Sequence, residues 1–361
     1  MKKSVAASYC FLNKPVKSHR SNVVRDANLR WRRFRKNRRG FISFILFCVI
    51  FGVSLFSEFI ANDKPLLLYY NGQIYFPVFK NYSELEFGGE FDINADFKDP
   101  YMQNLINNNG WLLMPPIPFS HSTINYTLPQ PAPSPPTTEN IFGTDDRGRD
   151  VAARLLYGFR ISVLFGITLT IFSSLVGIFF GAMQGYYGGT FDLIFQRFME
   201  VWSGMPSLFM LIILSSVVEP NFWWLLGITL LFGWMGLVGI VRAEFLRARN
   251  FEYVLSAQAM GMKNSRIMFV HILPNALSGV LSYLPFILGA SITTLTSLDF
   301  LGFGLPSGSP SLGEILAQGK ANLQAPWLGI ASFLTLAVTL SLLVFIGEAV
   351  RDAIDPRRNT K

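Results

Sequence analysis

Few side chains in this sequence have the type and spacing that chemistry requires. The three histidines, His19, His121 and His271, lie far apart in the sequence, and none has a partner at the spacing of a metal site. The two cysteines, Cys10 and Cys48, form neither a disulfide framework nor a metal-binding pair. No acid and base pair marks a catalytic site either. We therefore expect a chain that is not an enzyme and that binds no metal or cofactor.

The nearest match to a phosphate-binding loop is Gly313–Lys320, which is followed by Ala321. The nucleotide-binding pattern G-x-x-x-x-G-K-[ST] needs a hydroxyl after the lysine. Here the spacing is one residue too long and the hydroxyl is missing. If this protein takes part in active transport, another chain must supply the ATPase.

The segment with the clearest functional pattern is Tyr253–Gly261, whose sequence is Tyr-Val-Leu-Ser-Ala-Gln-Ala-Met-Gly. Val254, Ala257 and Gly261 fall on one helical face, at positions i, i+3 and i+7. Small residues on one face allow a helix to dock closely on a partner, and Gly261 stands where the helix should end. Spacing alone leaves an alternative, a surface helix that leads into the next apolar segment. In that next segment Pro274 suits the first helical turn.

These segments need a membrane-embedded scaffold, because half of the 361 residues are hydrophobic and only 15% are charged. A helix needs about 20 apolar residues to cross a bilayer. The sequence therefore predicts an all-α integral membrane protein with six transmembrane helices. The six apolar blocks are residues 41–60, 159–183, 193–218, 222–241, 277–298 and 327–347.

The distribution of charge predicts that both termini face the cytoplasm. Residues 1–39 carry thirteen Lys or Arg and one acid, whereas residues 62–157 carry six Lys or Arg and eleven acids. Lysine and arginine beside a span hold that end inside. The basic run before the first span is therefore an orientation signal with some contact to anionic lipid, and not a nucleic-acid site.

The predicted organisation has five parts. They are a basic cytoplasmic tail (1–39), a first transmembrane anchor (40–61), a sizeable outer loop (62–157), a transmembrane domain (158–350) with an inner loop (242–276), and a cytoplasmic C-terminus (351–361). In the outer loop, Asn71-Gly72 between apolar residues predicts a β-hairpin. The proline-rich stretch 129–136 predicts an extended strap.

Small residues recur every fourth position in the second span, at Ser173, Gly177, Gly181, Gly185 and Gly189. This spacing places them on one helix face, where small side chains let two helices approach closely. We expect a tight interface there, with the last two glycines in the turn to the next span. In the fourth span, Gly233, Gly236 and Gly239 suggest close packing more weakly.

The inner-loop segment resembles the coupling motif of ABC importer permeases, E-A-A-x3-G-x9-I-x-L-P. Four positions of the motif match, namely Ala257, Gly261, Leu273 and Pro274. Three positions depart from it, namely Leu255, Ser256 and His271. His271 begins His-Ile-Leu-Pro-Asn, which is similar to the peptide branch of the family. Tyr253, Val254 and His271 are therefore grouped with the matching residues as the expected contact to an ATPase.

Other segments resemble the oligopeptide and dipeptide permeases of the C-subunit type. They are Phe142–Asp150, Arg154, Tyr157–Arg160, Phe300–Gly304, Ser309–Gly313, Ala325–Trp327 and Gly347–Pro356. The match covers about residues 140–358. Ala61–Pro65 and Asn221–Trp224 extend the resemblance to one type of peptide importer, which also admits microcin C-like peptides.

The resemblance implies a multi-pass permease subunit in the bacterial inner membrane, with the outer loop in the periplasm. It also implies four kinds of partner: a homologous second permease, a cytoplasmic ABC ATPase that uses ATP, a periplasmic substrate-binding protein and a peptide substrate. Nickel or another small solute stays open as the substrate. A passive channel is the rival class, although it has no reason for a long inner docking loop.

Charged residues are few in the predicted spans, where a charge at a helix centre costs about 2.5–3.5 kcal/mol, and four charged residues are candidates for gating or for the pore mouth. Arg197 and Glu200, three residues apart, can pair with each other or take part in gating. Asp299 and Glu314 lie on the predicted outer side. They can line the pore mouth and attract a peptide N-terminus, or act as ordinary helix caps.

Overall fold

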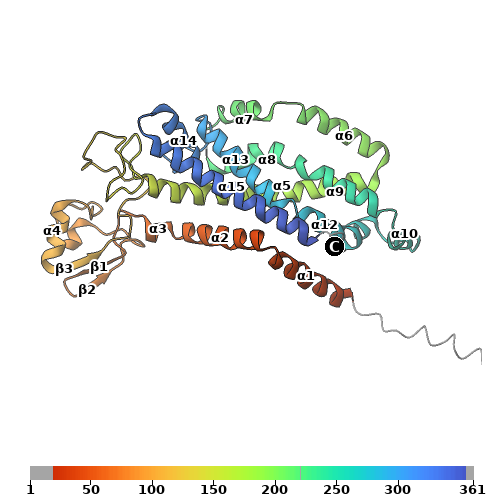
Figure 1. Cartoon of the computed structure of the whole chain (residues 1–361), viewed down its shortest axis with the longest axis horizontal. Coiled ribbons are helices and arrows are strands. Elements are labelled where there is room, and N and C mark those ends of the chain that lie inside the picture. The colour runs from red at the N-terminus through yellow and green to blue at the C-terminus, as the bar shows by residue number, and fades with distance from the viewer. Residues whose placement is uncertain (1–18, 220, 355–361) are drawn as a thin grey trace, which may run out of the picture.

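The computed structural model describes residues 19–219 and 221–354, with side chains from residue 28 onward. The fold is a bundle of long helices with a small β-sheet at one end and α10 at the opposite end (Figure 1). We call these the sheet end and the α10 end. The predictions for residues 1–18, including Cys10, and for residues 355–361 lie outside the described residues.

The described residues form the following helices and strands, in chain order. They are α1 (His19–Lys36), α2 (Arg38–Leu55), α3 (Ser57–Ile60), β1 (Leu67–Tyr70), β2 (Gln73–Tyr75), the 3₁₀ turn η1 (Glu84–Phe87), α4 (Pro100–Asn109), β3 (Gly110–Leu113), α5 (Val151–Tyr187), α6 (Gly189–Ser203), α7 (Ser207–Ser215), α8 (Phe222–Gly233), α9 (Met235–Ala248), α10 (Glu252–Ala259), α11 (Asn264–Arg266), the π-helix η2 (Ile267–Ile272), α12 (Leu273–Leu281), α13 (Leu284–Phe300), α14 (Leu312–Ala321) and α15 (Pro326–Ile354).

Among the described residues, three single helices are long and apolar enough to cross a membrane: α2, α5 and α15. Three further pairs meet the same test together but are bent, by 69° between α6 and α7, 42° between α8 and α9, and 58° between residues 264–281 and α13. The chain thus has three candidate spans, or up to six if each bent pair is one span. An integral membrane protein built of helices is confirmed, with breaks that apolar content alone does not reveal.

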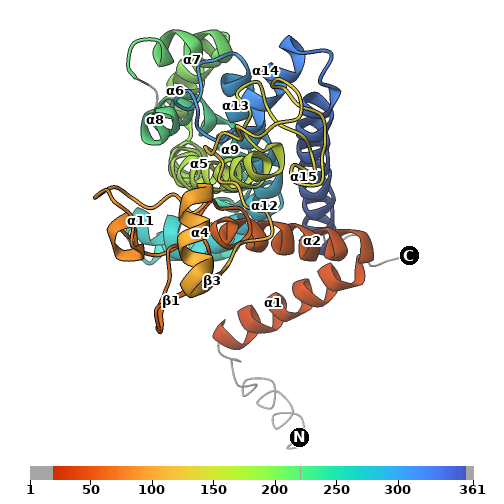
Figure 2. The ribbon, with the colours of Figure 1, turned by 90° about the vertical axis from the view of Figure 1, so that its left-hand side faces the viewer.

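The longest helix, α5, forms the centre of the bundle. It packs along α9 and α13, while α15 packs on α2 and α14. Helix α2 and the α6–α7 pair lie on opposite sides of α5 (Figures 1 and 2). Helix α5 contacts most of the other spans, and it runs from the sheet end of the molecule toward the α10 end.

The sheet end contains a three-stranded antiparallel sheet in the order β2-β1-β3. The predicted hairpin is confirmed, since β1 pairs with β2 around Asn71 and Gly72, whose φ angles are +50° and +82°. Strand β3, which comes after α4, adds a third strand that the sequence pattern did not predict. A buried apolar cluster joins the sheet to α4 through Leu68, Tyr70, Phe87, Phe97, Met102 and Ile106.

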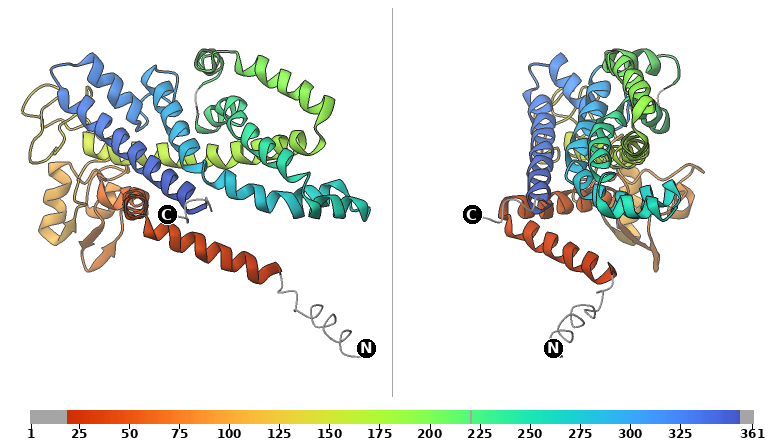
Figure 3. Two further views of the ribbon diagram at one scale, coloured as in Figure 1. Left: turned by 45° about the vertical axis from the view of Figure 1, so that its right-hand side comes forward. Right: turned by 90° about the vertical axis from the view of Figure 1, so that its right-hand side faces the viewer.

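The predicted N-terminal tail is helical over His19–Lys36, where it forms α1. Asn37 separates α1 from α2, and its side chain caps α2 by accepting a hydrogen bond from the Gly40 N–H. Phe34 packs on Ala349 and Ala353 near the end of α15. Helix α1 runs away from the bundle at an angle to α2 (Figure 3).

Candidate functional site

The small residues of α5 lie against α9. A Cβ atom at Gly177 would lie 2.6 Å from the Trp234 carbonyl oxygen. At Gly181 it would lie 2.7 Å from the Cβ of Val241, and at Gly185 2.5 Å from the Cβ of Phe245. Such distances are too short for a side chain larger than hydrogen. Glycine is therefore required at all three positions for the two backbones to approach.

Two expectations about glycines are corrected by these contacts. Gly185 lies inside α5 and packs on α9, so it is not part of the turn; Gly188 and Gly189, both with positive φ, make the turn into α6. In α9, a Cβ at Gly236 or Gly239 would meet no atom within 4 Å. These two glycines face open space in this chain instead of a packed neighbour, because α9 presents its other face to α5.

Helix α10 is anchored by its apolar face and exposes the rest. Val254 is fully buried and Ala257 is 2% exposed, and both belong to a cluster formed with α5, α9 and η2. This corrects the predicted docking face, because Val254 and Ala257 contact the chain itself and are not available to a partner. The face that is free carries Tyr253, Leu255 and Met260, which is 75% exposed.

Gly261 ends α10 in the left-handed conformation, with φ of +73°. The Gly261 N–H donates to the Gln258 carbonyl at 2.9 Å, and the Met262 N–H donates to the Ala257 carbonyl at 3.1 Å. This pair of bonds is a Schellman cap, which satisfies carbonyls that the helix end leaves free. A Cβ at Gly261 would meet no atom within 4 Å, so backbone conformation, and not space, requires glycine here.

The residues after Gly261 form one continuous helix with a π-helical stretch before Pro274. Proline has no N–H to donate to the preceding turn, and η2 absorbs this loss where it meets α12. Ile267 and Ile272 are buried in the same cluster as α10, whereas His271 and Leu273 are half-buried. The Tyr186 hydroxyl donates to the Asn264 side chain at 2.9 Å, which ties this helix to the end of α5.

A buried charge cluster lies at the sheet end. Arg154, which is fully buried, pairs with Glu314 at 2.8 Å and with Asp145 at 3.4 Å. Arg149 pairs with Asp145 at 2.7 Å and with Glu314 at 3.3 Å. The Arg154 guanidinium also donates to the carbonyls of His121, Gly308 and Ser309. This cluster joins the loop before α5, the loop before α14 and α14 itself.

The sequence patterns pointed to Glu314 but not to its partners. Arg149 and Arg154 lie in segments that resemble the permease family, but their sequence neighbours predict no role, because their shared partner Glu314 lies 165 and 160 residues away. The acidic residue Asp150 has a local role: its carboxylate accepts from the Ala153 N–H at 2.7 Å and caps α5. Burial raises the pKa of Asp150, although hydrogen bonds from Asn140 and Ala153 oppose that rise.

The other charged candidates are engaged within the chain. Asp299 is buried and accepts from the Leu305 N–H at 2.8 Å and from the Ser311 hydroxyl, so it holds the loop between α13 and α14. Arg197 and Glu200 pair with each other on an exposed face of α6. A pair that was not predicted, Asp192 with Arg242 at 2.6 Å, connects α6 to α9.

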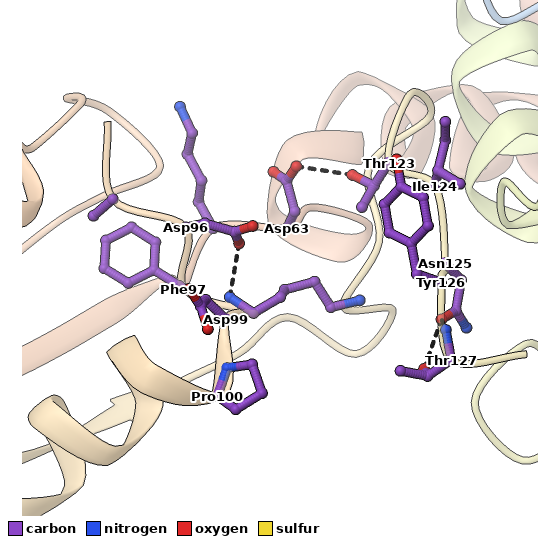
Figure 4. A pocket seen from close by; sticks show the side chains of 13 residues that line it. Asp63, Asp96, Phe97, Asp99, Pro100, Thr123, Ile124, Asn125, Tyr126 and Thr127 are labelled. Carbon is purple, nitrogen blue, oxygen red and sulfur yellow. Dashed lines mark hydrogen bonds between the residues drawn. The ribbon is translucent and has the colours of Figure 1, made fainter. Parts of the chain in front are cut away.

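A polar cavity of about 570 Å³ lies between the small sheet subdomain and residues 123–127 (Figure 4). Asp63 accepts a hydrogen bond from Thr123 at 2.8 Å across its edge. Lys98 lies over the Phe119 ring, and burial lowers the pKa of its ammonium group. Within the described part of the chain, no group of three or more His, Cys, Asp or Glu side chains could hold a metal ion.

Comparison with known proteins identifies two family regions. The family described as "Binding-protein-dependent transport system inner membrane component" matches residues 157–360. The family described as "N-terminal TM domain of oligopeptide transport permease C" matches residues 26–77. The first region begins inside α5 and extends beyond α15, so it includes the glycine interface and α10.

Three curated relatives show how far the similarity extends. The inner membrane ABC transporter permease protein YejE of Escherichia coli (strain K12) is 63% identical over 329 residues, which cover 91% of this chain and 96% of the relative. The peptidoglycan transport system permease protein YejE of Agrobacterium fabrum (strain C58) is 56% identical over 353 residues, 91% of this chain and 92% of the relative. The oligopeptide transport system permease protein OppC of Bacillus subtilis (strain 168) is 33% identical over 240 residues, 66% of this chain and 78% of the relative.

Proposed function

The chain belongs to the family of inner-membrane components of binding-protein-dependent transport systems, and from that premise we propose that it is the pore-forming permease subunit of an ATP-driven peptide importer. The relatives named as oligopeptide, dipeptide and peptidoglycan permeases support the substrate class. Microcin C-like peptides stay a prediction within it.

The proposed assembly contains four other components. A homologous second permease completes the pore, a cytoplasmic ABC ATPase hydrolyses ATP, a periplasmic binding protein delivers the peptide, and lipid surrounds the spans. The chain has no nucleotide-binding loop of its own. ATP binding to the ATPase would therefore drive the pore between its inward-open and outward-open states.

The proposed orientation places the α10 end in the cytoplasm and the sheet end in the periplasm. The basic residues around α1 and the acidic excess of residues 62–157 favour it. Six spans with both termini inside, and the five-part organisation predicted above, are part of the proposal. The binding protein would then meet the sheet subdomain, its polar cavity and the loops of residues 300–326.

Labelling of single cysteines tests the orientation. Asn108 and Asn264 are both exposed, at the sheet end and the α10 end respectively. In the orientation proposed, an impermeant reagent added outside intact cells modifies Asn108→Cys and spares Asn264→Cys. The reverse pattern would put α10 outside and exclude an ATPase as its partner.

The observation that carries the proposal is the exposed face of α10. Tyr253 and Leu255 of α10 and its C-cap residue Met260 are exposed at one end of the bundle, while Val254 and Ala257 anchor the helix. A rigid helix with exposed apolar side chains fits a groove on a partner. A passive channel needs no such helix.

The proposal is tested by peptide uptake together with recovery of the ATPase. Met260→Asp places a charge on the exposed face without touching the anchor, so we expect weak recovery of the ATPase and little uptake. Leu323→Asp is the matched control, since Leu323 is 83% exposed at the opposite end; the ATPase should still be recovered. If Met260→Asp shows normal recovery of the ATPase and normal peptide uptake, α10 is not the coupling element. Nickel uptake without peptide uptake would change the substrate class.

A further inference from the structure

We infer that a membrane-embedded cavity bordered by α5, α7, α8, α9 and α13 is the part of the transport path that this chain contributes, and that it accepts hydrogen bonds from the N–H groups of the passing peptide. The inference rests on the proposed function and names the residues that would touch the substrate. The cavity has a volume of about 270 Å³. The residues that matter for the inference are Ser173, Ser207, Thr229, Gly236, Ser291 and Thr294.

The cavity lies where the spans are broken. Ser207 begins α7 directly after the 69° bend from α6, and Gly236 follows the 42° bend between α8 and α9. Irregular backbone at membrane depth is tolerated where it borders a cavity or is buried in protein. Broken helices also mark the substrate sites of many transporters, near the middle of the bilayer. The position of the cavity therefore fits a path through the membrane.

The break between α8 and α9 is held by specific contacts. The carbonyl of Leu231, near the end of α8, accepts hydrogen bonds from the indole N–H of Trp202 at 3.1 Å and of Trp234 at 3.0 Å. A carbonyl that a helix end leaves free is costly in hydrocarbon unless it finds a donor. Two indoles from α6 and from the bend itself supply these donors. The break is thus a built feature of the fold, and it keeps the cavity wall open beside Gly236.

Most of the lining is apolar, and its polar side chains are all of one kind. It carries five hydroxyl side chains and no charged side chain. The hydroxyl of Ser291 donates to the Ile287 carbonyl at 2.8 Å, that of Thr294 to the Ala290 carbonyl at 3.0 Å, and that of Thr229 to the Leu225 carbonyl at 2.7 Å. Each of these protons is therefore already used within a helix.

A hydroxyl oxygen has two acceptor lone pairs and one proton. Once the proton is donated to the helix, the oxygen offers acceptor sites to the cavity. The lining thus suits ligand groups that donate, such as amide N–H and ammonium groups. Every peptide has such groups whatever its side chains are, and an uncharged lining does not select for one side-chain charge. The chemistry fits passage of peptides of varied sequence.

Two glycines that face open space provide a matched test. A Cβ at Gly236 or at Gly52 would meet no atom within 4 Å, and both glycines lie in candidate spans. Gly236 borders the cavity, whereas Gly52 lies on α2, away from it. The Cβ of a phenylalanine therefore meets no atom at either position, and only Gly236→Phe places its ring at the border of the cavity.

The experiment measures uptake of a radiolabelled oligo-alanine peptide by the whole importer, with recovery of the ATPase as the assembly control. Both variants should assemble. Gly236→Phe should lower the uptake rate by about tenfold or more, the scale on which a pocket discriminates by size, while Gly52→Phe should not. An assembled Gly236→Phe importer with the parent uptake rate would overturn the inference.

A second measurement does not depend on how Gly236→Phe folds. In a chain with Cys10→Ser and Cys48→Ser, a cysteine in place of Thr294 should react with a small polar thiol reagent, and oligo-alanine with ATP present should slow that reaction. A cysteine in place of Ile171, on the exposed side of α5, should show no such protection. Equal rates with and without peptide at Thr294→Cys would overturn the inference. If the importer with its native cysteines imports no peptide, it is the proposed function that fails.

Discussion

The two ends of α5 are held in opposite ways. At its N-terminal end, Asp150 caps the helix, and Arg154 is enclosed by acidic side chains and loop carbonyls. At its C-terminal end, α5 is held by the close packing of Gly181 and Gly185 against α9 and not by buried charges. The neighbouring helix α10 exposes apolar side chains. The sheet end of α5 is thus held by buried charges, whereas the α10 end combines close apolar packing with the exposed side chains that we propose meet the ATPase.

This difference indicates how the chain can transmit motion. A buried network whose donors and acceptors are matched favours one arrangement of the loops around it. A helix that is anchored on one face and free on the other can move only together with its anchor. The α10 segment is packed on α5, α9 and η2. A displacement of α10 would therefore be transmitted directly to these membrane spans.

The largest effect on stability is expected when one buried charge is removed from the sheet end. Arg154→Met removes the nearest partner of Glu314, at 2.8 Å, and leaves Asp145 paired with Arg149 alone. Loss of one member of a buried ion pair costs about 3–5 kcal/mol. Arg160→Met is the control on the same helix, because Arg160 pairs with the exposed Glu58 at 3.4 Å, and such pairs contribute about 0–1 kcal/mol. Denaturant unfolding in detergent should separate the two variants; equal stabilities would contradict the role of the cluster.

The next effect concerns the glycine interface at the other end of α5. Gly181→Leu forces α5 and α9 apart, and overpacking of this kind costs about 1–3 kcal/mol or more. Gly227→Leu on α8 is the control, since a Cβ there meets no atom within 4 Å. Thermal stability in detergent and recovery of the second permease should both fall only for Gly181→Leu. Unchanged values for that variant would mean that α5 and α9 are not in close contact.

A smaller effect on folding, but loss of transport, is expected at the cap of α10. Gly261→Asp strains a left-handed position, at about 1–2 kcal/mol, and adds a charge beside the exposed face. Gly302→Asp is the control, because Gly302 has φ of +80° and equally open space at the sheet end. Both variants should insert normally, and Gly261→Asp should lose ATPase recovery and peptide uptake. Wild-type behaviour of Gly261→Asp would separate α10 from coupling.

The smallest effect is a pH dependence at the sheet end. Burial, followed by the nearby Arg154 and Arg160, lowers the pKa of His121 below its ordinary value of 6.5. Below pH 6.5 the His121 imidazole is protonated in the unfolded chain but stays neutral in the folded chain until the pH reaches its lowered pKa. The free energy of unfolding therefore falls as the pH drops through 6.5, and it stops falling below the pKa of the folded state. Melting temperatures measured from about pH 8 to about pH 5 should show this decline. In His121→Gln the part of the decline due to this group should disappear.

Local patterns were sufficient for several features. The four-residue spacing of small residues placed Gly177 and Gly181 on one face, Asn71-Gly72 predicted the hairpin, and Gly261 was placed at a helix end. Each of these depends on residues close together in the sequence, where helix period or backbone conformation decides the outcome. The apolar blocks likewise follow from the length that a bilayer requires.

Long-range contacts decided the rest. The sequence by itself determined that the chain is a helical membrane protein, that its charge is asymmetric and that α10 ends at a glycine. Only the tertiary structure decided which face of α10 is free, because Val254 and Ala257 are buried by helices that follow or precede them by many residues. It also decided that Glu314 meets Arg154, since a charge finds its partner by proximity in space and not in sequence. The bends of 69°, 42° and 58° within the paired helices are likewise visible only in the tertiary structure.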